Sequence, residues 1–406
     1  MAPSENRAQK SLLLNAFVEM CSGHQSPGLW RHPDDESWRF NDAHHWIELA
    51  KLLEEAKFHG IFIADVLGGY DVYKGRHNLD PAIVSGAQWP VNEPLAVVPA
   101  MAAATENIGF GVTVATTYEQ PYHLAGRLST VDHLTNGRIG WNIVTGYLDS
   151  AARNLGLSEQ PRHDDRYAIA EEYVKVTYKL WESSWRDDAV VRDRERGVYT
   201  EPSLQRTPLI LQAGTSKAGK LFAAQRAEAI FVGGHSPSVV SQSIAEIREL
   251  AKTRFGRDPR SLKFLALFCP VLGRTKEEAQ KKFADYRNIG SVEGALALFG
   301  GWTGIDLNQY DDDQALRHVE SNAIKSAVEA WSKASPGTPE QVADELERWV
   351  AEADVDGFNF VYALKPGSFD DIIELLLPDL RRRGLFWNNY AVNGGTYREN
   401  FYGKKG

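Results

Sequence analysis

The order of apolar and amphipathic segments is the feature that most constrains how this chain can fold. Short runs that are apolar at nearly every position alternate with longer segments of helical periodicity. A strand that is apolar on both faces is covered on both sides, as in a parallel sheet flanked by helices. The predicted strands are SLLLNAFV from Ser11, GIFIAD from Gly60, IGFGVTVAT from Ile108, RIGWNIVT from Arg138, PLILQA from Pro208, EAIFVG from Glu228, KFLALFCPVLG from Lys263 and GFNFVYA from Gly357.

Amphipathic segments fill most of the gaps between these runs, for example HHWIELAKLLEEAKFHG after Asp42 and EEYVKVTYKLWESSW after Asp165. Asp42, Ser236 and Thr338 stand where helix N-caps are expected, because their side chains can accept hydrogen bonds from free backbone N–H groups. Eight strands that are mostly separated by helices predict an α/β fold, a TIM-like (β/α)8 barrel. A doubly wound sheet is the alternative.

Two segments depart from this alternation. Within a barrel that spans residues 1–383, the stretch of about 275–337 carries no strand candidate, so we expect a mostly helical insertion there. The tail 384–406, GLFWNNYAVNGGTYRENFYGKKG, is aromatic and irregular. We expect it to form a C-terminal arm across a neighbouring molecule rather than an element of the barrel.

Charge and composition exclude several kinds of protein. The 406 residues carry a net charge of −9 without a Lys/Arg cluster, so neither a nucleic-acid partner nor a membrane surface is expected. The longest apolar run is far shorter than the ~20 residues of a membrane-spanning helix. The N-terminus is polar where a secretory signal would be apolar. Cys21 and Cys269 are the two cysteines, and we expect a cytoplasmic protein without a disulfide framework.

In a barrel of this kind the functional residues lie at the carboxyl ends of the strands. This rule selects the segments Cys21 to His24, Asp65 to Tyr70, Thr113 to Tyr118, Asn142 to Tyr147, Gly214 to Lys220 and Gly233 to His235, together with Tyr362. Aromatic residues crowd the same end, which favours a flat apolar ligand or a pocket that excludes water. They are Trp89, Tyr118, Tyr122, Trp141 and Tyr147.

The segment GTSKAGK, from Gly214 to Lys220, follows a predicted strand and opens a predicted helix, as a P-loop does. A P-loop needs Ser or Thr after the lysine to hold magnesium, and here that residue is Leu221. Free N–H groups at the helix start, beside Ser216, would instead suit a phosphate monoester, although an ordinary capped turn explains the same residues. No G-x-G-x-x-G turn follows a strand and no metal-binding motif occurs, so no metal site is expected.

Residues at this end of the barrel suggest two other kinds of active site. A glycosidase needs two carboxylates, and Asp65 is the one clear candidate, with Glu119 a weak second. Cys21 and His24 could form a nucleophile and its base, but two pocket-lining side chains are the simpler interpretation. A phosphate-bearing aromatic cofactor in a dry barrel mouth fits these residues best. Flavin mononucleotide (FMN) is one of several molecules that meet this description.

Several blocks in order carry a resemblance to a known family. They are LNAFVEMCSGHQSPGLWRHP, FIADVLGGYDVY, QWPVNEP, TTYEQPYHLAGRLSTVDHLTNGRIGWNIVTG, RHDDRYAIAEEY, PLILQAGTS and GTYRENFYGK, which together extend from about Leu14 to Lys404. The chain resembles the flavin-dependent monooxygenases of the bacterial luciferase-like superfamily. Within that superfamily it is most similar to the group that acts on nitrilotriacetate, EDTA, dibenzothiophene sulfone and long-chain alkanes, with the alkane enzymes nearest.

The resemblance implies an activity and its partners. These enzymes take FMNH2 from a separate NAD(P)H-dependent flavin reductase and react it with O2 to a C4a-(hydro)peroxide, which transfers one oxygen atom to a small organic substrate. For this chain the resemblance favours an apolar substrate similar to a long-chain alkane, and a homodimer or tetramer. The protein's task would be to orient the flavin and to exclude water.

The resemblance also implies site residues. The positions matching FMN-binding residues are Asp65, Thr113, Asn142, His163, Tyr167 and Ser216. Those near the reactive edge of the flavin are His24, Tyr70 and Cys21 as catalytic candidates, and Gln88, Tyr147 and Trp302 on the substrate side. Of these, His24 and Tyr70 are the ones expected to hydrogen-bond to the substrate or to the oxygenated flavin.

Some positions depart from the family's pattern. Trp302 stands where many relatives have a histidine, which is expected to narrow the pocket. Near residue 200 the sequence lacks a lid-like stretch that relatives carry, and it is shortened again before Gly337. Two other functions stay open: a deazaflavin-dependent dehydrogenase on the same barrel, and a flavin-binding protein that has lost its lids and does not catalyse a reaction.

Overall fold

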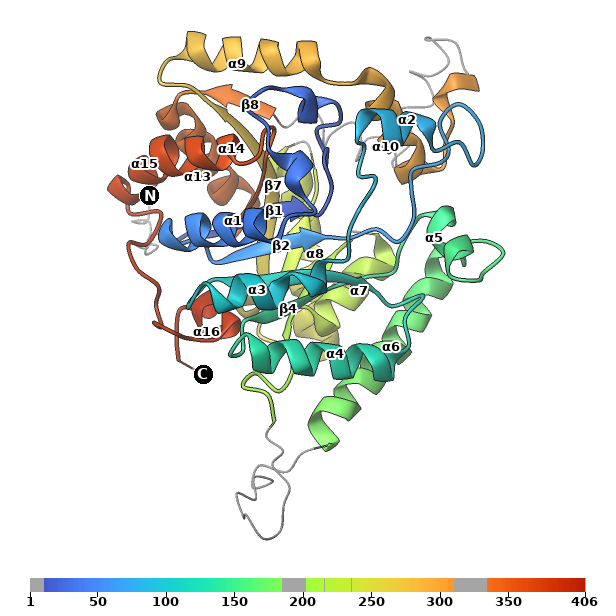
Figure 1. Cartoon of the computed structure of the whole chain (residues 1–406). Coiled ribbons are helices and arrows are strands. Elements are labelled where there is room, and N and C mark those ends of the chain that lie inside the picture. Colours follow the sequence, from blue (N-terminus) through green and yellow to red (C-terminus); the bar gives the residue numbers. More distant parts are fainter. Residues whose placement is uncertain (1–10, 185–201, 215, 235, 310–333, 406) are drawn as a thin grey trace.

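The computed structural model describes residues 11–184, 202–214, 216–234, 236–309 and 334–405. Nine parallel strands run through this part of the chain, and helices surround them (Figure 1). The strands are β1 Leu13–Glu19, β2 Gly60–Ala64, β3 Gly109–Ala115, β4 Ile139–Val144, β5 Leu209–Ala213, β6 Ala229–Val232, β7 Lys263–Leu272, β8 Ala334–Gly337 and β9 Gly357–Val361.

The pairing of the strands decides between the two predicted architectures. Strands β1 to β6 are paired in chain order, β1 also pairs with β9, β9 with β7, and β7 with β6. This ring of eight parallel strands is closed, which confirms the TIM-like barrel and removes the doubly wound sheet. All eight strands expected from the sequence are present.

β8 was not predicted, and the expectation of an insertion without a strand is wrong at this point. β8 pairs with the far half of β7, outside the ring, from Cys269 opposite Ala334 to Leu272 opposite Gly337. Its sequence, ASPG, lacks the β-branched and aromatic residues that signal a strand. Earlier in the insertion two helices are present, as expected: α9, Lys276–Ile289, and α10, Val292–Thr303. Residues 310–333 lie outside the described part.

Helices cover the outside of the barrel, and α1, α8 and α13 begin directly after the predicted caps Asp42, Ser236 and Thr338. The helices are α1 Ala43–Glu55, α2 Asp80–Ser85, α3 Val98–Ala103, α4 Pro121–Leu134, α5 Asp149–Asn154, α6 His163–Ser183, α7 Lys217–Arg226, α8 Pro237–Phe255, α9 Lys276–Ile289, α10 Val292–Thr303, α13 Pro339–Ala353, α14 Gly367–Asp371, α15 Leu377–Arg382 and α16 Tyr397–Tyr402. The Asp42 side chain accepts from the His44 N–H at 2.9 Å, and Thr338 forms a capping box with Gln341. Ser236 is an N-cap by position, but its hydroxyl bonds to the Ser238 hydroxyl at 3.0 Å instead of to a backbone N–H of the helix.

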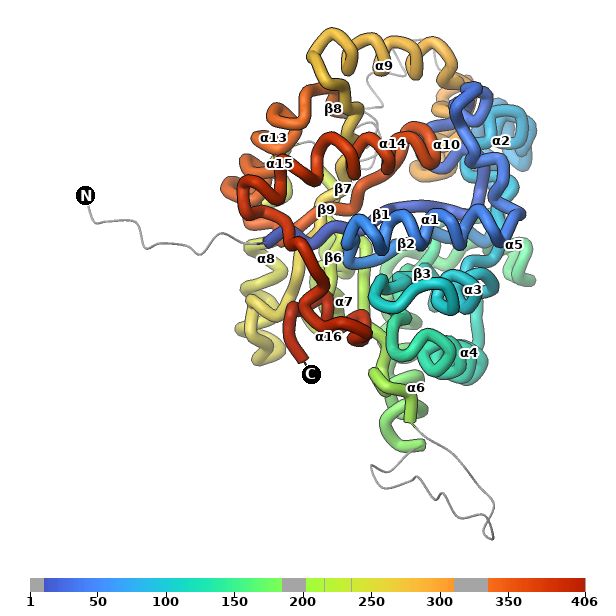
Figure 2. Tube along the Cα trace, turned by 60° about the vertical axis from the view of Figure 1, so that its left-hand side comes forward, coloured from blue at the N-terminus to red at the C-terminus, as the bar shows by residue number. Residues whose placement is uncertain are grey.

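Successive side chains on each strand point alternately out of the barrel and into its lumen, so they form two separate cores. Those that face outward join the helices in one large cluster, in which Trp46, Trp141 and Phe264 are fully buried. Those that face the lumen form a second cluster, with Phe62, Leu211 and others packed inside the ring. Helices α2 and α10 pack together at the carboxyl ends of the strands, whereas α16 lies at the other end (Figure 1, and from a second side Figure 2).

The C-terminal tail packs against its own barrel, whereas an arm across a neighbour was expected. Tyr397, in α16, is fully buried at the amino ends of β2, β3 and β4. Three glycines in neighbouring strands, Gly60, Gly109 and Gly140, leave room for its ring, since a Cβ on any of them would lie 3.0 Å or closer to it. We call this end, with Tyr397 and its three glycines, the barrel floor.

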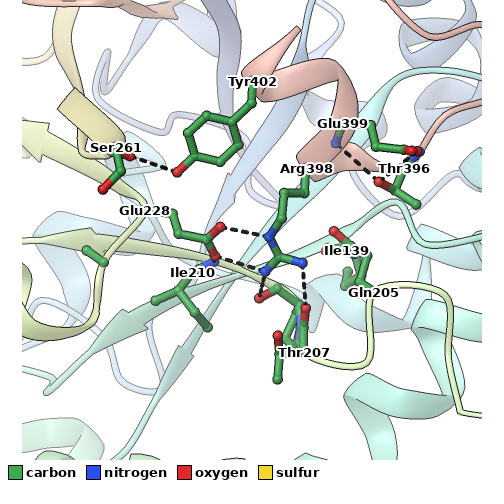
Figure 3. A network of polar contacts seen from close by, with 12 residues as sticks. Ile139, Gln205, Thr207, Ile210, Glu228, Ser261, Thr396, Arg398, Glu399 and Tyr402 are labelled. Atoms are coloured by element: carbon green, nitrogen blue, oxygen red, sulfur yellow. Dashed lines mark hydrogen bonds and ion pairs between the residues drawn. The ribbon is translucent and has the colours of Figure 1, made fainter. Parts of the chain in front are cut away.

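Polar contacts fix α16 to the floor (Figure 3). The Arg398 guanidinium donates to both carboxylate oxygens of Glu228 at 2.7 and 2.9 Å, and to the carbonyl oxygens of Thr207 and Pro208 at 3.0 Å each. The Tyr402 hydroxyl donates to the carbonyl oxygen of Ser261 at 2.8 Å. A bidentate pair of this kind fixes orientation as well as charge, so the floor is a closed and specific structure.

Candidate functional site

Three of the residues predicted to bind FMN meet at the carboxyl ends of adjacent strands. Thr113 and Asn142 are opposite each other in the register of β3 and β4, and the Asn142 amide donates to the Thr113 hydroxyl at 2.9 Å. Asp65 directly follows the neighbouring strand β2. Both Thr113 and Asn142 are buried, yet the Asn142 Oδ1 atom has no hydrogen-bond partner. A buried acceptor without a partner is costly unless a ligand supplies a donor.

Asp65 lies in an acidic environment. The pKa of its carboxyl is raised to about 7, mainly by burial and also by Glu93 and Glu119, while the Val66 N–H and Arg127 offset part of the rise. Arg127 is itself paired with Glu93 at 3.1 Å and with Glu119 at 2.7 Å. The Asp65 carboxyl is therefore poised to be neutral or charged near neutral pH, according to the ligand beside it.

Tyr167 and Ser216, two more of the FMN candidates, meet at the start of α7. Ser216 is the N-cap of this helix and accepts from the Gly219 N–H at 3.1 Å. Burial raises the pKa of Tyr167, and a hydrogen bond with Ser216 offsets part of that rise. The Tyr167 hydroxyl lies so close to Gly214 and Gly219 that a Cβ on either would approach it within 2.8 Å.

His163, at the first turn of α6, stands at the edge of this group. Its ring centroid is 5.1 Å from that of Tyr167, while its Nδ1 atom is 2.8 Å from an Asp164 carboxylate oxygen. The side chain is half exposed. The structure thus places His163 beside Tyr167 and in contact with solvent.

Two polar residues near the flavin positions were missed by the sequence analysis. Arg166, one residue before Tyr167, has a buried Nε atom without a partner, and burial lowers the pKa of its guanidinium. Gln212, near the end of β5, is almost fully buried, and its Oε1 atom has no partner. A signal was available in each case, because both lie within the blocks RHDDRY and LILQAGTS that carry the family resemblance.

The candidates on the substrate side form a second cluster beyond the ends of β2 and β4. The Tyr70 hydroxyl donates to the Gln88 side-chain oxygen and lies 2.5 Å from the Tyr147 hydroxyl. The Trp302 ring stands edge-on to the Tyr70 ring, with their centroids 6.4 Å apart. Tyr70 is fully buried and Tyr147 is 44% exposed, so the cluster extends from the core to the surface. The structure brings all four residues together.

Cys21 and His24 also lie at this end, after β1, but not as a nucleophile and its base. The Cys21 sulfur accepts from the backbone N–H of His24 at 3.2 Å, and it lies 3.5 Å from the Glu19 Oε2 atom. Burial raises the pKa of the Cys21 thiol well above its usual value. The contact holds the backbone of His24, whose φ is +37°. The Cys21 sulfur therefore helps to hold the backbone of the loop that carries His24.

The His24 ring is buried and its two nitrogens have no partners. It packs between Phe17, with centroids 4.7 Å apart, and Tyr362, at 5.6 Å. Burial and, to a smaller extent, the charge of Lys365 together lower the pKa of His24 to about 3. At neutral pH the ring is uncharged and offers one donor and one acceptor.

Glu19 and Lys365 are two further charged residues that the sequence analysis did not select. Glu19 ends β1 and is fully buried, and Lys365 follows β9 and is also fully buried. The Lys365 ammonium has no hydrogen-bond partner and lies 4.4 Å from the centroid of the Trp46 ring. An acid that closes an apolar strand was a usable signal for Glu19, since the same pattern selected Asp65.

Two of the aromatic residues expected at this end lie elsewhere. Trp141 faces the outer core, where its indole N–H donates to the Val114 carbonyl oxygen at 3.1 Å. Tyr122, on α4, is 76% exposed. It lines a surface groove of about 700 Å³ with residues of α4 and α6, and no predicted site residue lines that groove. The candidate site is thus the end of the barrel that holds Asp65, Asn142, Tyr70 and His24, here called the barrel mouth.

The described residues contain neither a metal-binding cluster nor a membrane-spanning helix. No group of three or more His, Cys, Asp or Glu side chains in that part of the chain could hold a metal ion. Among its helices, none is both long and apolar enough to cross a membrane.

Comparison with known proteins gives one consistent family. Residues 17–357 match the family described as luciferase-like monooxygenase. The chain is 44% identical to the long-chain alkane monooxygenase of Geobacillus thermodenitrificans, with 97% of this chain and 95% of the relative covered. It is 43% identical to the dimethyl-sulfide monooxygenase of Hyphomicrobium sulfonivorans, with 97% and 91% covered.

A solved structure extends the comparison to a bound flavin. Riboflavin lyase, crystallised with a modified FMN and its substrate riboflavin, superposes with a TM-score of 0.88 at 32% identity. The match covers 98% of this chain and 96% of that one. The barrel described above is therefore shared with a protein that holds a flavin.

Proposed function

This chain is a flavin-dependent monooxygenase of the luciferase-like family, and we propose that it uses FMNH2 and O2 to insert one oxygen atom into a small apolar substrate. We further propose that a separate NAD(P)H-dependent flavin reductase supplies the FMNH2. The observation that carries the proposal is the meeting of Asp65, Thr113 and Asn142 at the ends of adjacent strands, with a buried acceptor left unsatisfied.

The residues of the barrel mouth fit an FMN molecule. Asn142 Oδ1 is an unsatisfied buried acceptor for a ring N–H, and Asp65 follows β2, which is next to β3 in the ring. The N-terminus of α7 with Ser216, together with Tyr167 and the Arg166 guanidinium, offers donors and positive charge to a phosphate. Bound FMNH2 would supply the electrons that activate O2. The chain's own residues orient it and exclude water.

The environment of the Tyr70 cluster favours a neutral, apolar substrate. Its buried neighbours include Ala82, Leu148 and Leu298. The nearby cation, Arg153, is already paired with Asp71 and Asp149, so it has little charge to offer an anionic substrate. A long-chain alkane or a molecule of similar polarity is our favoured class. The nearly equal identity to alkane and dimethyl-sulfide enzymes leaves carbon and sulfur oxidation to be separated by experiment.

We assign His24 and Tyr70 to the contact with the substrate and the reactive edge of the flavin. His24 can donate from one ring nitrogen and accept at the other, because neither is engaged within the protein. The Tyr70 hydroxyl is held in place by Gln88 and Tyr147. Trp302 closes the edge of this cluster. Preorganised groups of this kind stabilise developing charge without having to reorganise.

A binding experiment tests the phosphate assignment. Replacing Arg166 with Gln removes one charge-assisted contact, worth about 1.5–3 kcal/mol, so the affinity for FMN should fall by about tenfold or more. The affinity for riboflavin, which has no phosphate, should not change. Arg162→Gln is the matched control, because Arg162 lies on the same segment and is 87% exposed in an ion pair with Asp165. Equal losses for FMN and riboflavin would contradict the assignment.

Turnover under labelled O2 tests the reaction itself. With FMN, a flavin reductase, NADH and an apolar substrate, one atom of labelled oxygen should enter the product and O2 uptake should rise with substrate. Oxidation of a substrate without O2 uptake would instead support the deazaflavin-dependent dehydrogenase. Tight flavin binding without any turnover across alkanes, sulfides and amines would support a binding protein.

A further inference from the structure

We propose that Glu19 is a further functional residue of the barrel mouth, a neutral carboxylic acid that donates a hydrogen bond to the ligand held there. The inference deepens the proposed function and rests on it for the identity of the ligand. The state of the proton itself can be measured without any ligand.

Position supports this role. Glu19 is the last residue of β1 and has the same parity as Leu13 and Phe17, which belong to the lumen cluster, so its side chain faces the lumen. It stands opposite Ala64 in the register with β2, and Asp65 follows Ala64 directly. The Glu19 carboxyl therefore lies between the flavin candidate Asp65 and the loop that carries Cys21 and His24.

The contacts of the two carboxyl oxygens differ. The Oε2 atom accepts from the Cys21 thiol at 3.5 Å, whereas the Oε1 atom is buried and has no partner. A charged carboxylate normally satisfies both oxygens with donors. A carboxyl that has one weak donor and no solvent is more stable in its protonated form, and that form has an O–H to give away.

The charges that face Glu19 act in the same direction. Asp65, from the end of β2, opposes a negative charge on Glu19, and the Cys21 contact favours that charge weakly. Three tyrosines interact electrostatically with Glu19 and are uncharged themselves. They are Tyr70 and Tyr147, from the loops after β2 and β4, and Tyr362, at the end of β9. A cation near this group, Lys365, lowers the pKa of Cys21, which contacts Glu19. Burial and Asp65 together raise the pKa of Glu19 to about 8.

The ligand would contact the free side of this acid. The Oε1 atom has no protein partner, and the Glu19 carboxyl is close enough to Asp65, Tyr70 and Tyr147 to interact with them electrostatically. Glu19 therefore joins the two clusters of the mouth, the flavin group and the substrate group. In the charged form it would place a second negative charge beside Asp65 and weaken the binding of an anionic ligand such as FMN.

Infrared spectroscopy of the ligand-free protein tests the proton directly. At neutral pH the wild type should show the C=O stretching band of a protonated carboxyl, and Glu19→Gln should remove it. Glu172→Gln, the same change at an exposed position on α6, should leave it unchanged. In Asp65→Asn the band should disappear at a lower pH than in the wild type, because the neighbouring charge is gone. If the wild type has no protonated-carboxyl band, or if Glu19→Gln leaves that band unchanged, the proposal is wrong.

Titration of FMN binding tests the hydrogen bond to the ligand. From about pH 7 to about pH 9, across the pKa near 8, the wild-type affinity should fall by up to about tenfold. Glu19→Gln, which stays neutral and keeps an acceptor for Cys21, should show no such fall. If it shows the same fall as the wild type, the proton does not serve the ligand and the proposal is wrong. If the wild type binds no FMN at any pH, the proposed function fails, and the infrared band alone decides the state of Glu19.

Discussion

The two ends of this barrel differ in which of their buried polar groups have partners. At the floor, the Arg398 guanidinium and the Glu228 carboxylate form a bidentate pair, and the Tyr397 ring packs on three glycines, while one amide atom each of Asn400 and Gln205 has no partner. At the mouth, buried atoms of Glu19, His24, Asn142, Gln212 and Lys365 have no partner. Both ends belong to the same eight strands. The contrast indicates that the floor stabilises the fold, while the mouth keeps groups available to a ligand.

The largest expected effect comes from emptying the floor. Tyr397→Ala removes a fully buried aromatic ring, and three glycine backbones cannot close over the space. We expect the free energy of unfolding to fall by about 3–5 kcal/mol, as measured by urea denaturation. FMN affinity in the folded fraction should stay the same, because the mouth is at the other end.

A surface tyrosine provides the control for this change. Tyr122 is 76% exposed, so Tyr122→Ala should alter the free energy of unfolding by about 0.5 kcal/mol or less. A similar loss in both variants would mean that the floor has no special role. Loss of FMN binding in Tyr397→Ala would mean that the two ends are coupled.

The next largest expected effect is a gain in the free energy of unfolding, and it comes from replacing Lys365 at the mouth. Burial lowers the pKa of Lys365 from its usual value to about 8, so the folded protein holds this charge at a cost. Below pH 8 both the folded and the unfolded chain are protonated and the cost is complete. As pH rises above 8, the folded chain loses the proton first and the cost disappears. Lys365→Met should therefore stabilise the protein by about 1–3 kcal/mol near neutral pH.

Thermal unfolding as a function of pH measures this effect. The advantage of Lys365→Met over the wild type should be constant below pH 8 and should shrink above it. Lys51→Met, on the exposed face of α1, should show neither the gain nor its pH dependence. A destabilised Lys365→Met would show that the ammonium has a stabilising partner at the mouth, contrary to the contrast drawn here.

The smallest expected effect concerns the cap of the floor helix. Thr396 accepts from the Glu399 N–H at 3.2 Å and forms a capping box with that residue. Thr396→Ala should cost about 1 kcal/mol of unfolding free energy. Thr253→Ala, in the last turn of α8, should be neutral or slightly stabilising, because alanine is the better helix former. If chemical denaturation gives the same change in unfolding free energy for Thr396→Ala and Thr253→Ala, the cap does not stabilise the floor.

The two ends also differ in how far the sequence could predict them. Strands and capped helices follow from local periodicity, so the ring and the ends that carry Asp65, Thr113 and Asn142 were accessible. The floor was not, because Gly60, Gly109 and Gly140 are dispersed in sequence and acquire a shared meaning only when the strands come into register. β8 escaped for a related reason, since its pairing with β7 rather than its composition makes it a strand.

The same limit applied within the mouth. Motifs located residues that belong to recurring blocks, such as Ser216. Glu19 was overlooked because its functional meaning depends on what surrounds it: Asp65 across the register, the Cys21 thiol at 3.5 Å, and one oxygen without a donor. Such facts are set by tertiary packing and are not written in the local sequence.

The seat of Tyr397 has a consequence for how the protein is made. Residues 397–402 follow every strand in the chain, yet they occupy the lumen between β2, β3 and β4. During synthesis those strands leave the ribosome long before the ring that fills the hole between them. The nascent barrel therefore carries an open, glycine-lined base until Tyr397 has been synthesised and has emerged. In this period, we expect the growing chain to depend on chaperones, and early termination to release an aggregation-prone product.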